Sequence, residues 1–148
     1  MGKLAKKYFP TETGYGSVQV VIDELKMPND KSYWALMSKD VLNGSRNKSF
    51  KKQQKMVSEL SKKASVQCEV PKALEAVVSI LTHQVRSGVR LFSDNPVTYT
   101  RCLEELADFQ VLVGGFAPSG LRVPYLLSYA NPCFGVAVLR KFRSLAIG

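Results

Sequence analysis

Apolar and polar positions alternate near the start of the chain. The segment 17–25 (SVQVVIDEL) is rich in Val and Ile and partly alternates, with Val18, Val20 and Ile22 on one face. Such alternation is the period of a half-buried strand. A turn signal follows at 27–30 (MPND), and the apolar run 33–37 (YWALM) is typical of a returning strand. The pattern therefore predicts a β-hairpin within residues 17–40.

From about Arg46 the apolar period changes from 2 to about 3.6. Phe50, Val57, Leu60 and Ala64 then share one side of an amphipathic helix that begins near Arg46 and extends to Lys63. At 100° per residue, six lysines fall within an arc of about 120° on the opposite side. They are Lys48, Lys51, Lys52, Lys55, Lys62 and Lys63.

Further helices are predicted along the rest of the chain. Pro71 suits the first position of a second helix, and Gly88 its end. An N-cap signal at 94–96 (DNP) predicts a third helix, with Val97, Leu103, Leu106 and Cys102 facing inward. The last segment, 133–147, fits a helix through Phe134, Val138, Phe142 and Leu145, although its Val-Ala-Val run also fits a strand. The second helix would bury a stripe formed by Leu74, Val77, Val78, Leu81 and Val85.

These elements predict a single α+β domain spanning residues 1–148. The N-terminal β-hairpin is followed by three or four packed helices, so that 46–148 is mainly helical. Residues 1–16 form a basic arm in which Pro10 and two glycines interrupt regular structure. A chain of 148 residues suits one hydrophobic core and leaves no room for two.

Composition narrows the class of protein. Hydrophobic residues make up 45% of the chain, which is enough to offset the entropy of ordering and argues against disorder. No apolar run is long enough for a membrane-spanning helix. Lys plus Arg number 21 against 12 for Asp plus Glu, a net charge of +9 that favours polyanionic partners.

The positive charge is concentrated in three places. The window 45–63 contains seven basic residues, and Glu59 is its one acid. The lysines of the predicted helix from Arg46 to Lys63 repel one another. A bound polyanion would relieve that repulsion, whereas water only screens it. The alternative is that these lysines form a solvent-exposed helix face that binds no partner. The candidate nucleic-acid-binding residues are the six lysines named above, Lys3, Lys6 and Lys7 in the arm, and Arg140, Lys141 and Arg143 near the C-terminus.

Signals for catalysis are weak. His83, the only histidine, is expected at the surface or boundary of its helix rather than as a general base. The segment 115–120 (GFAPSG) has the glycine spacing of a phosphate-binding loop, but Leu121 and Arg122 stand where that loop needs Lys and Ser or Thr. It is therefore interpreted as a turn. No metal ion or other cofactor is predicted, since no C-x-x-C pair occurs.

The three cysteines and the lack of a secretory signal predict reduced thiols and a cytoplasmic location. The leading hypothesis is a non-enzymatic protein that binds RNA in preference to duplex DNA. It would also self-associate as a structural protein of the capsid or nucleocapsid kind, with the basic ends as assembly arms. One alternative is a peripheral, matrix-type protein that docks on anionic lipid. The other is a small enzyme whose site is assembled from scattered residues.

Overall fold

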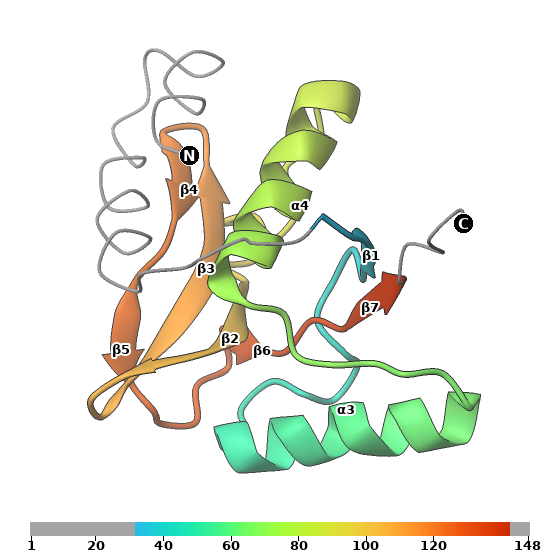
Figure 1. Ribbon diagram of the computed structural model, residues 1–148. Coiled ribbons are helices and arrows are strands. Elements are labelled where there is room, and N and C mark those ends of the chain that lie inside the picture. Colours follow the sequence, from blue (N-terminus) through green and yellow to red (C-terminus); the bar gives the residue numbers. More distant parts are fainter. Residues whose placement is uncertain (1–31, 143–148) are drawn as a thin grey trace, which may run out of the picture.

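The computed structural model describes residues 32–142 (Figure 1). This part of the chain contains two helices, α3 (Phe50–Ala64) and α4 (Ala73–Ser87), and seven strands. The strands are β1 (Trp34–Met37), β2 (Tyr99–Leu106), β3 (Phe109–Ala117), β4 (Gly120–Arg122), β5 (Tyr125–Leu127), β6 (Phe134–Gly135) and β7 (Leu139–Phe142).

The larger sheet has five strands and is packed against α4. Its order is β4–β3–β2–β6, and β5 also pairs with β3. Strands β2 and β3 form an antiparallel pair, whereas β6 lies parallel to β2. Helix α4 stands against this sheet (Figure 1), and the main hydrophobic core lies between them. The contributing side chains include Ala76, Val77, Ile80 and Leu81 of α4 and Val111, Val113, Phe116 and Leu121 of the sheet.

The smaller sheet is a two-stranded antiparallel ribbon of β1 and β7. Its register runs from Trp34 opposite Phe142 to Met37 opposite Leu139. The ribbon therefore joins the beginning and the end of the described chain. Backbone hydrogen bonds in both directions between Glu69 and Leu139 attach β7 to the segment before α4.

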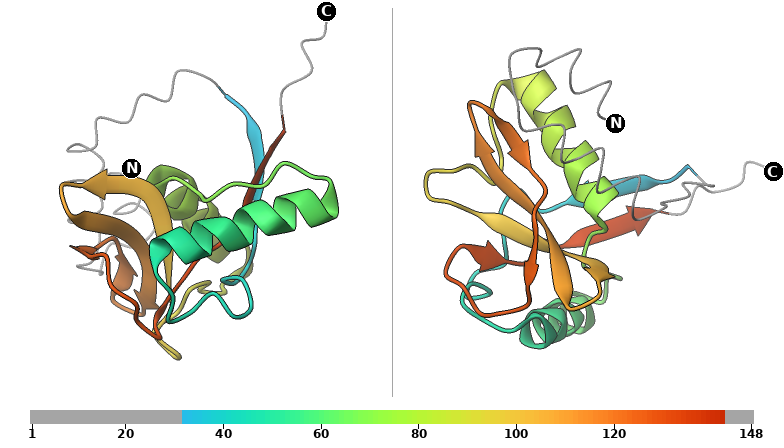
Figure 2. Two further views of the ribbon diagram at one scale, coloured as in Figure 1. Left: turned by 90° about the horizontal axis from the view of Figure 1, so that it is seen from below. Right: turned by 90° about the vertical axis from the view of Figure 1, so that its left-hand side faces the viewer.

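Helix α3 lies apart from the main core, across the chain that runs through β6 into β7 (Figures 1 and 2). Phe50 and Val57 of α3 pack there with Val70 and Val136, and this second cluster is smaller than the main core. The half-buried Leu42, Cys68 and Val138 complete it.

The prediction of three or four packed helices is wrong. The described residues contain two helices, and strands occupy the places predicted for the third and the last. The last segment was ambiguous because Phe134, Val138 and Phe142 are spaced by four residues. That spacing puts them on one face of a helix, and on one face of a strand as well, since four is a multiple of the strand period.

The 94–96 signal is followed by strand β2 instead of a helix, and residues 94–97 form a tight turn. Of the residues predicted to face inward there, Cys102 is buried, whereas Val97 and Leu103 are exposed. Tyr99, Thr98 and Thr100 are residue types that favour strands, and all three are buried. Pairing with the long, buried strand β3 outweighs the local capping signal.

The strand predicted at 33–37 is confirmed as β1, but its partner is β7 at the far end of the chain. The first strand of the predicted hairpin, 17–25, lies outside the described residues, as does the arm 1–16. Helix α4 ends at Gly88 as predicted, with a left-handed φ of 73°. It begins later than predicted, because Lys72 is its N-cap and Pro71 precedes the helix. Its buried stripe is Ala73, Ala76, Val77, Ile80 and Leu81, so the predicted members Val78 and Val85 are exposed instead.

Candidate nucleic-acid interface

Helix α3 is delimited by serines at both ends. The Ser49 hydroxyl accepts a hydrogen bond from the backbone N–H of Lys52 at 3.4 Å, the usual N-cap arrangement. Ser65 adopts a left-handed conformation (φ 52°) and donates its N–H to the Lys62 carbonyl. The first turn contains no acidic residue. Lysines in that turn therefore face the positive end of the helix dipole, which is unfavourable.

The buried side of α3 is fixed by a polar anchor as well as by apolar contacts. Gln53 is fully buried between Phe50 and Val57 along the helix. Its side-chain amide donates to the Ser45 carbonyl at 2.8 Å and to the Phe134 carbonyl at 3.1 Å. Because these acceptors belong to two different segments, the amide sets the rotation of α3 about its own axis. The opposite side of the helix must then face solvent.

Five predicted lysines occupy that outer side, and all five are exposed: Lys51, Lys52, Lys55, Lys62 and Lys63. We call this set the lysine ridge. Lys55 forms an ion pair with Glu59 at 3.8 Å, and both side chains are largely exposed. Among residues 32–142, the other four ridge lysines have no ion-pair partner. The ridge is thus a line of largely uncompensated ammonium groups on a rigid support.

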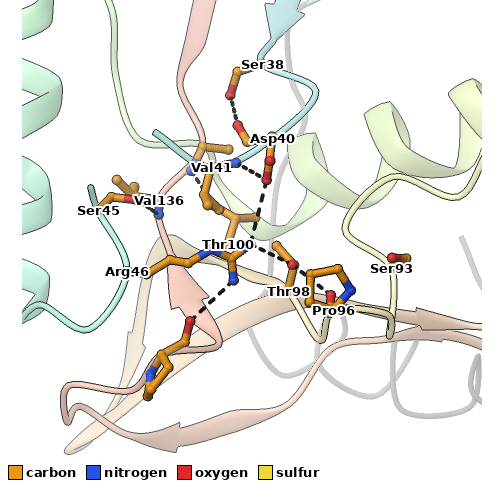
Figure 3. A network of polar contacts seen from close by, with 12 residues as sticks. Ser38, Asp40, Val41, Ser45, Arg46, Ser93, Pro96, Thr98, Thr100 and Val136 are labelled. Atoms are coloured by element: carbon orange, nitrogen blue, oxygen red, sulfur yellow. Dashed lines mark hydrogen bonds and ion pairs between the residues drawn. The ribbon is translucent and has the colours of Figure 1, made fainter. Parts of the chain in front are cut away.

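The loop before α3 is held by Arg46, whose role the sequence did not reveal (Figure 3). Its guanidinium donates to the Thr98 hydroxyl at 2.7 Å and to the Pro132 carbonyl at 3.3 Å. Asp40 lies 3.9 Å from the same group. Arg46 therefore joins the start of α3 to the beginning of β2 and to the loop before β6.

A second arginine, Arg101 of β2, is buried below the start of α3, with 1% of its surface exposed. It donates to the Lys48 carbonyl at 3.2 Å and to the Tyr129 carbonyl. Its guanidinium also lies 5.7 Å from the centre of the Phe134 ring. Burial lowers the pKa of the Arg101 guanidinium, because water no longer solvates its charge. Lys48 precedes the helix and is half-buried, so it stands at the edge of the ridge rather than on it.

The C-terminal candidates fall in different environments. Lys141 is paired with Glu69 at 2.5 Å and with Glu75 at 2.8 Å. Partial burial alone would lower the pKa of the Lys141 ammonium, but hydrogen bonds to the two carboxylates outweigh it and raise that pKa. Arg140 is exposed, and its guanidinium lies 4.6 Å from the centre of the Phe142 ring. The remaining candidates, Lys3, Lys6, Lys7 and Arg143, lie outside the described residues.

The candidate phosphate loop is confirmed as a turn. Strands β3 and β4 form a hairpin in which Ala117 pairs with Gly120, so that two residues close it. Gly115 has a φ of 55°, and a side chain there would collide with the Tyr99 hydroxyl. Close packing between strands therefore explains the glycine.

The other side chains that could take part in catalysis or bind a metal ion are scattered over the described chain. His83 is half-buried on α4, and burial raises the pKa of the Cys102 thiol well above its usual value, which makes that thiol a poor nucleophile. No set of three or more His, Cys, Asp and Glu side chains within 32–142 is arranged to hold a metal ion. Neither α3 nor α4 is long and apolar enough to span a bilayer.

The feature that the sequence concealed is the outer side of the β1–β7 ribbon. Trp34 is 79% exposed and Leu36 is 64% exposed. In the sequence they are part of an apolar run that predicts a strand, and that run does not show which of its side chains face solvent. No family model, characterised protein or solved structure matches the chain.

Proposed function

We propose that this protein binds nucleic acid, RNA in preference to duplex DNA, through the lysine ridge of α3, and that it does so without catalysing a reaction. The observation that carries the proposal is the ridge itself, with four of its five lysines unpaired within the described chain. A buried glutamine and a small apolar cluster hold it in place.

The electrostatics of α3 support a phosphate polymer as the partner. Lys51 and Lys52 lie in the first helical turn, where their charges oppose the helix dipole. The rise of a helix separates Lys51 from Lys55 by about 6 Å and from Lys63 by about 18 Å along the axis. A backbone of regularly spaced phosphates following this line would neutralise several lysines and release its own counterions.

The mode of binding expected is backbone contact without sequence readout. Between the ridge lysines in the sequence, the exposed polar side chains are Gln54, Ser58 and Glu59. The helix is attached along one whole side, which restricts how far it can enter a groove. We therefore expect affinity that depends steeply on salt and only weakly on base sequence.

The test is a salt titration of RNA binding by the triple variant K51Q/K52Q/K55Q. Affinity for single-stranded RNA is expected to fall several-fold, and the slope of log K against log salt to shrink by about 0.7 for each phosphate that the variant no longer neutralises. The matched control is R86Q/R90Q/R122Q, which removes the same charge from exposed positions outside α3. Equal decreases in the two variants would show that net charge alone attracts RNA and would contradict a role for the ridge.

Self-association on the nucleic acid and the cytoplasmic location remain predictions from the sequence. Both can be examined with the same protein, by light scattering with and without RNA and by fractionation of cells that express it.

A further inference from the structure

The outer face of the β1–β7 ribbon combines apolar and basic side chains. Residues directly opposite each other in an antiparallel pair project to the same side. Trp34 therefore stands beside Phe142, and Leu36 beside Arg140. Among the side chains whose exposure the structure describes, Trp34 is the most exposed large hydrophobic one. We call these four residues the ribbon face.

The ribbon face continues the surface on which α3 lies. Val136 and Val138 pack against α3 in the second cluster. Because side chains alternate along a strand, Arg140 and Phe142 project to the same side as Val138. The lysine ridge lies on the opposite side of α3 from these contacts. Figure 1 shows β7 and the C-terminal end of α3 on the same flank.

The reverse side of the ribbon is firmly attached to the body of the protein. Lys141 is joined there to Glu69 and Glu75, and the Tyr33 hydroxyl donates to the Glu75 carboxylate. Met37 packs against the main core. These contacts hold the ribbon in one orientation, so Trp34 and its neighbours are presented on a preorganised support.

We propose that the ribbon face docks on an anionic lipid bilayer. Trp34 and Leu36 would enter the interfacial region, where tryptophan is favoured and aliphatic side chains leave water. Arg140 would lie against the negatively charged headgroups, and the net charge of +9 adds to the attraction. This proposal does not depend on RNA binding, because it rests on apolar residues outside α3.

A nucleobase fits this face less well than a bilayer. The Arg140 guanidinium lies over the Phe142 ring, 4.6 Å from its centre. It therefore covers a face of that ring on which a base could otherwise stack. Leu36, which is 64% exposed, offers no π face to a base. An aliphatic side chain beside tryptophan and a basic rim is the composition expected of a membrane-docking surface.

The experiment uses Trp34, the only tryptophan of the chain, as a fluorescent reporter in the full-length protein. Adding phosphatidylcholine vesicles that contain phosphatidylserine is expected to shift its emission to shorter wavelength and to increase its intensity. Vesicles of phosphatidylcholine alone should do so much less. The proposal is overturned if anionic vesicles leave the emission unchanged, or if single-stranded RNA quenches Trp34 while vesicles do not.

Matched leucine variants locate the contact. L36A is expected to lower the partition coefficient on anionic vesicles about tenfold in a flotation assay. L127A is the control, because Leu127 is 56% exposed on β5, away from the ribbon (Figure 1). Circular dichroism of both variants tests whether each is folded. An unchanged partition of L36A, or an equal decrease in L127A, would contradict docking through the ribbon face.

Discussion

The two helices of the described chain have the same length, 15 residues each, and serve opposite purposes. Helix α4 buries five residues, all of them apolar, against the large sheet. Helix α3 buries Phe50, Gln53 and Val57 against a small cluster and leaves most of its surface in water. Helix α4 contributes stability through burial, whereas α3 displays charge. A polar anchor orients α3 where apolar area is scarce.

The largest effect should come from truncating the core side of α4. I80A removes a fully buried side chain and is expected to lower the free energy of unfolding by about 2–5 kcal/mol. V78A is its control on the same helix, because Val78 is 40% exposed and should cost less than about 0.5 kcal/mol. Urea denaturation measures both. A similar cost for the two variants would mean that α4 buries a different face.

The next effect concerns the polar anchor of α3. Q53L keeps the volume of the side chain but leaves the Ser45 and Phe134 carbonyls without their donor, at an expected cost of about 1–3 kcal/mol. Q54L changes the exposed neighbour and should be close to neutral. Thermal melts compare the two variants, and RNA titration shows whether the ridge loses its position. If Q53L were neutral, apolar contacts alone would orient the helix.

A smaller, pH-dependent effect is expected at the start of α4. Burial of the Glu75 carboxyl favours its neutral form, but hydrogen bonds from Lys141, Tyr33 and the Lys72 N–H outweigh it and lower its pKa from 4.5. A lowered carboxyl pKa adds stability above the unfolded value, and this contribution is lost as the pH falls through the folded value. E75Q should therefore be less stable than the unmodified protein at pH 7, with the difference shrinking below about pH 4.5.

Thermal melts between neutral and acidic pH follow this difference. E59Q is the control, because it removes the exposed acid of α3, where an ion pair contributes little. A constant gap between E75Q and the unmodified protein across this range would contradict the assignment.

The smallest expected effect is an increase in the RNA affinity of the lysine ridge on α3. E59Q removes the acid that compensates Lys55 on the ridge. Stability should change by less than about 0.5 kcal/mol, since the pair is exposed. RNA affinity should rise modestly, because the ridge becomes more positive. Fluorescence anisotropy at fixed salt measures the change, and a decrease in affinity would indicate that Glu59 itself contacts the partner.

The local sequence pattern correctly predicted the elements whose conformation depends mainly on residues close to them in the sequence. The helix predicted from about Arg46 to Lys63 is observed as Phe50–Ala64, because the 3.6-residue spacing of apolar positions has no equivalent in a strand. Gly88 ended α4 for the same local reason, a left-handed conformation that suits glycine. The four-residue spacing in the last segment carried no such information, and strand pairing decided its structure.

The sequence by itself determined that a run of lysines would face away from an apolar stripe, since both follow from one helical period. Only the tertiary structure decided which basic residues near the C-terminus remain available. Arg140 and Lys141 are adjacent, yet alternation along β7 turns one outward and the other toward Glu69 and Glu75. The same pairing leaves Trp34 exposed. The environments of Arg140, Lys141 and Trp34 depend on partners more than 60 residues away in the sequence. The spacing of neighbouring residues therefore cannot predict them.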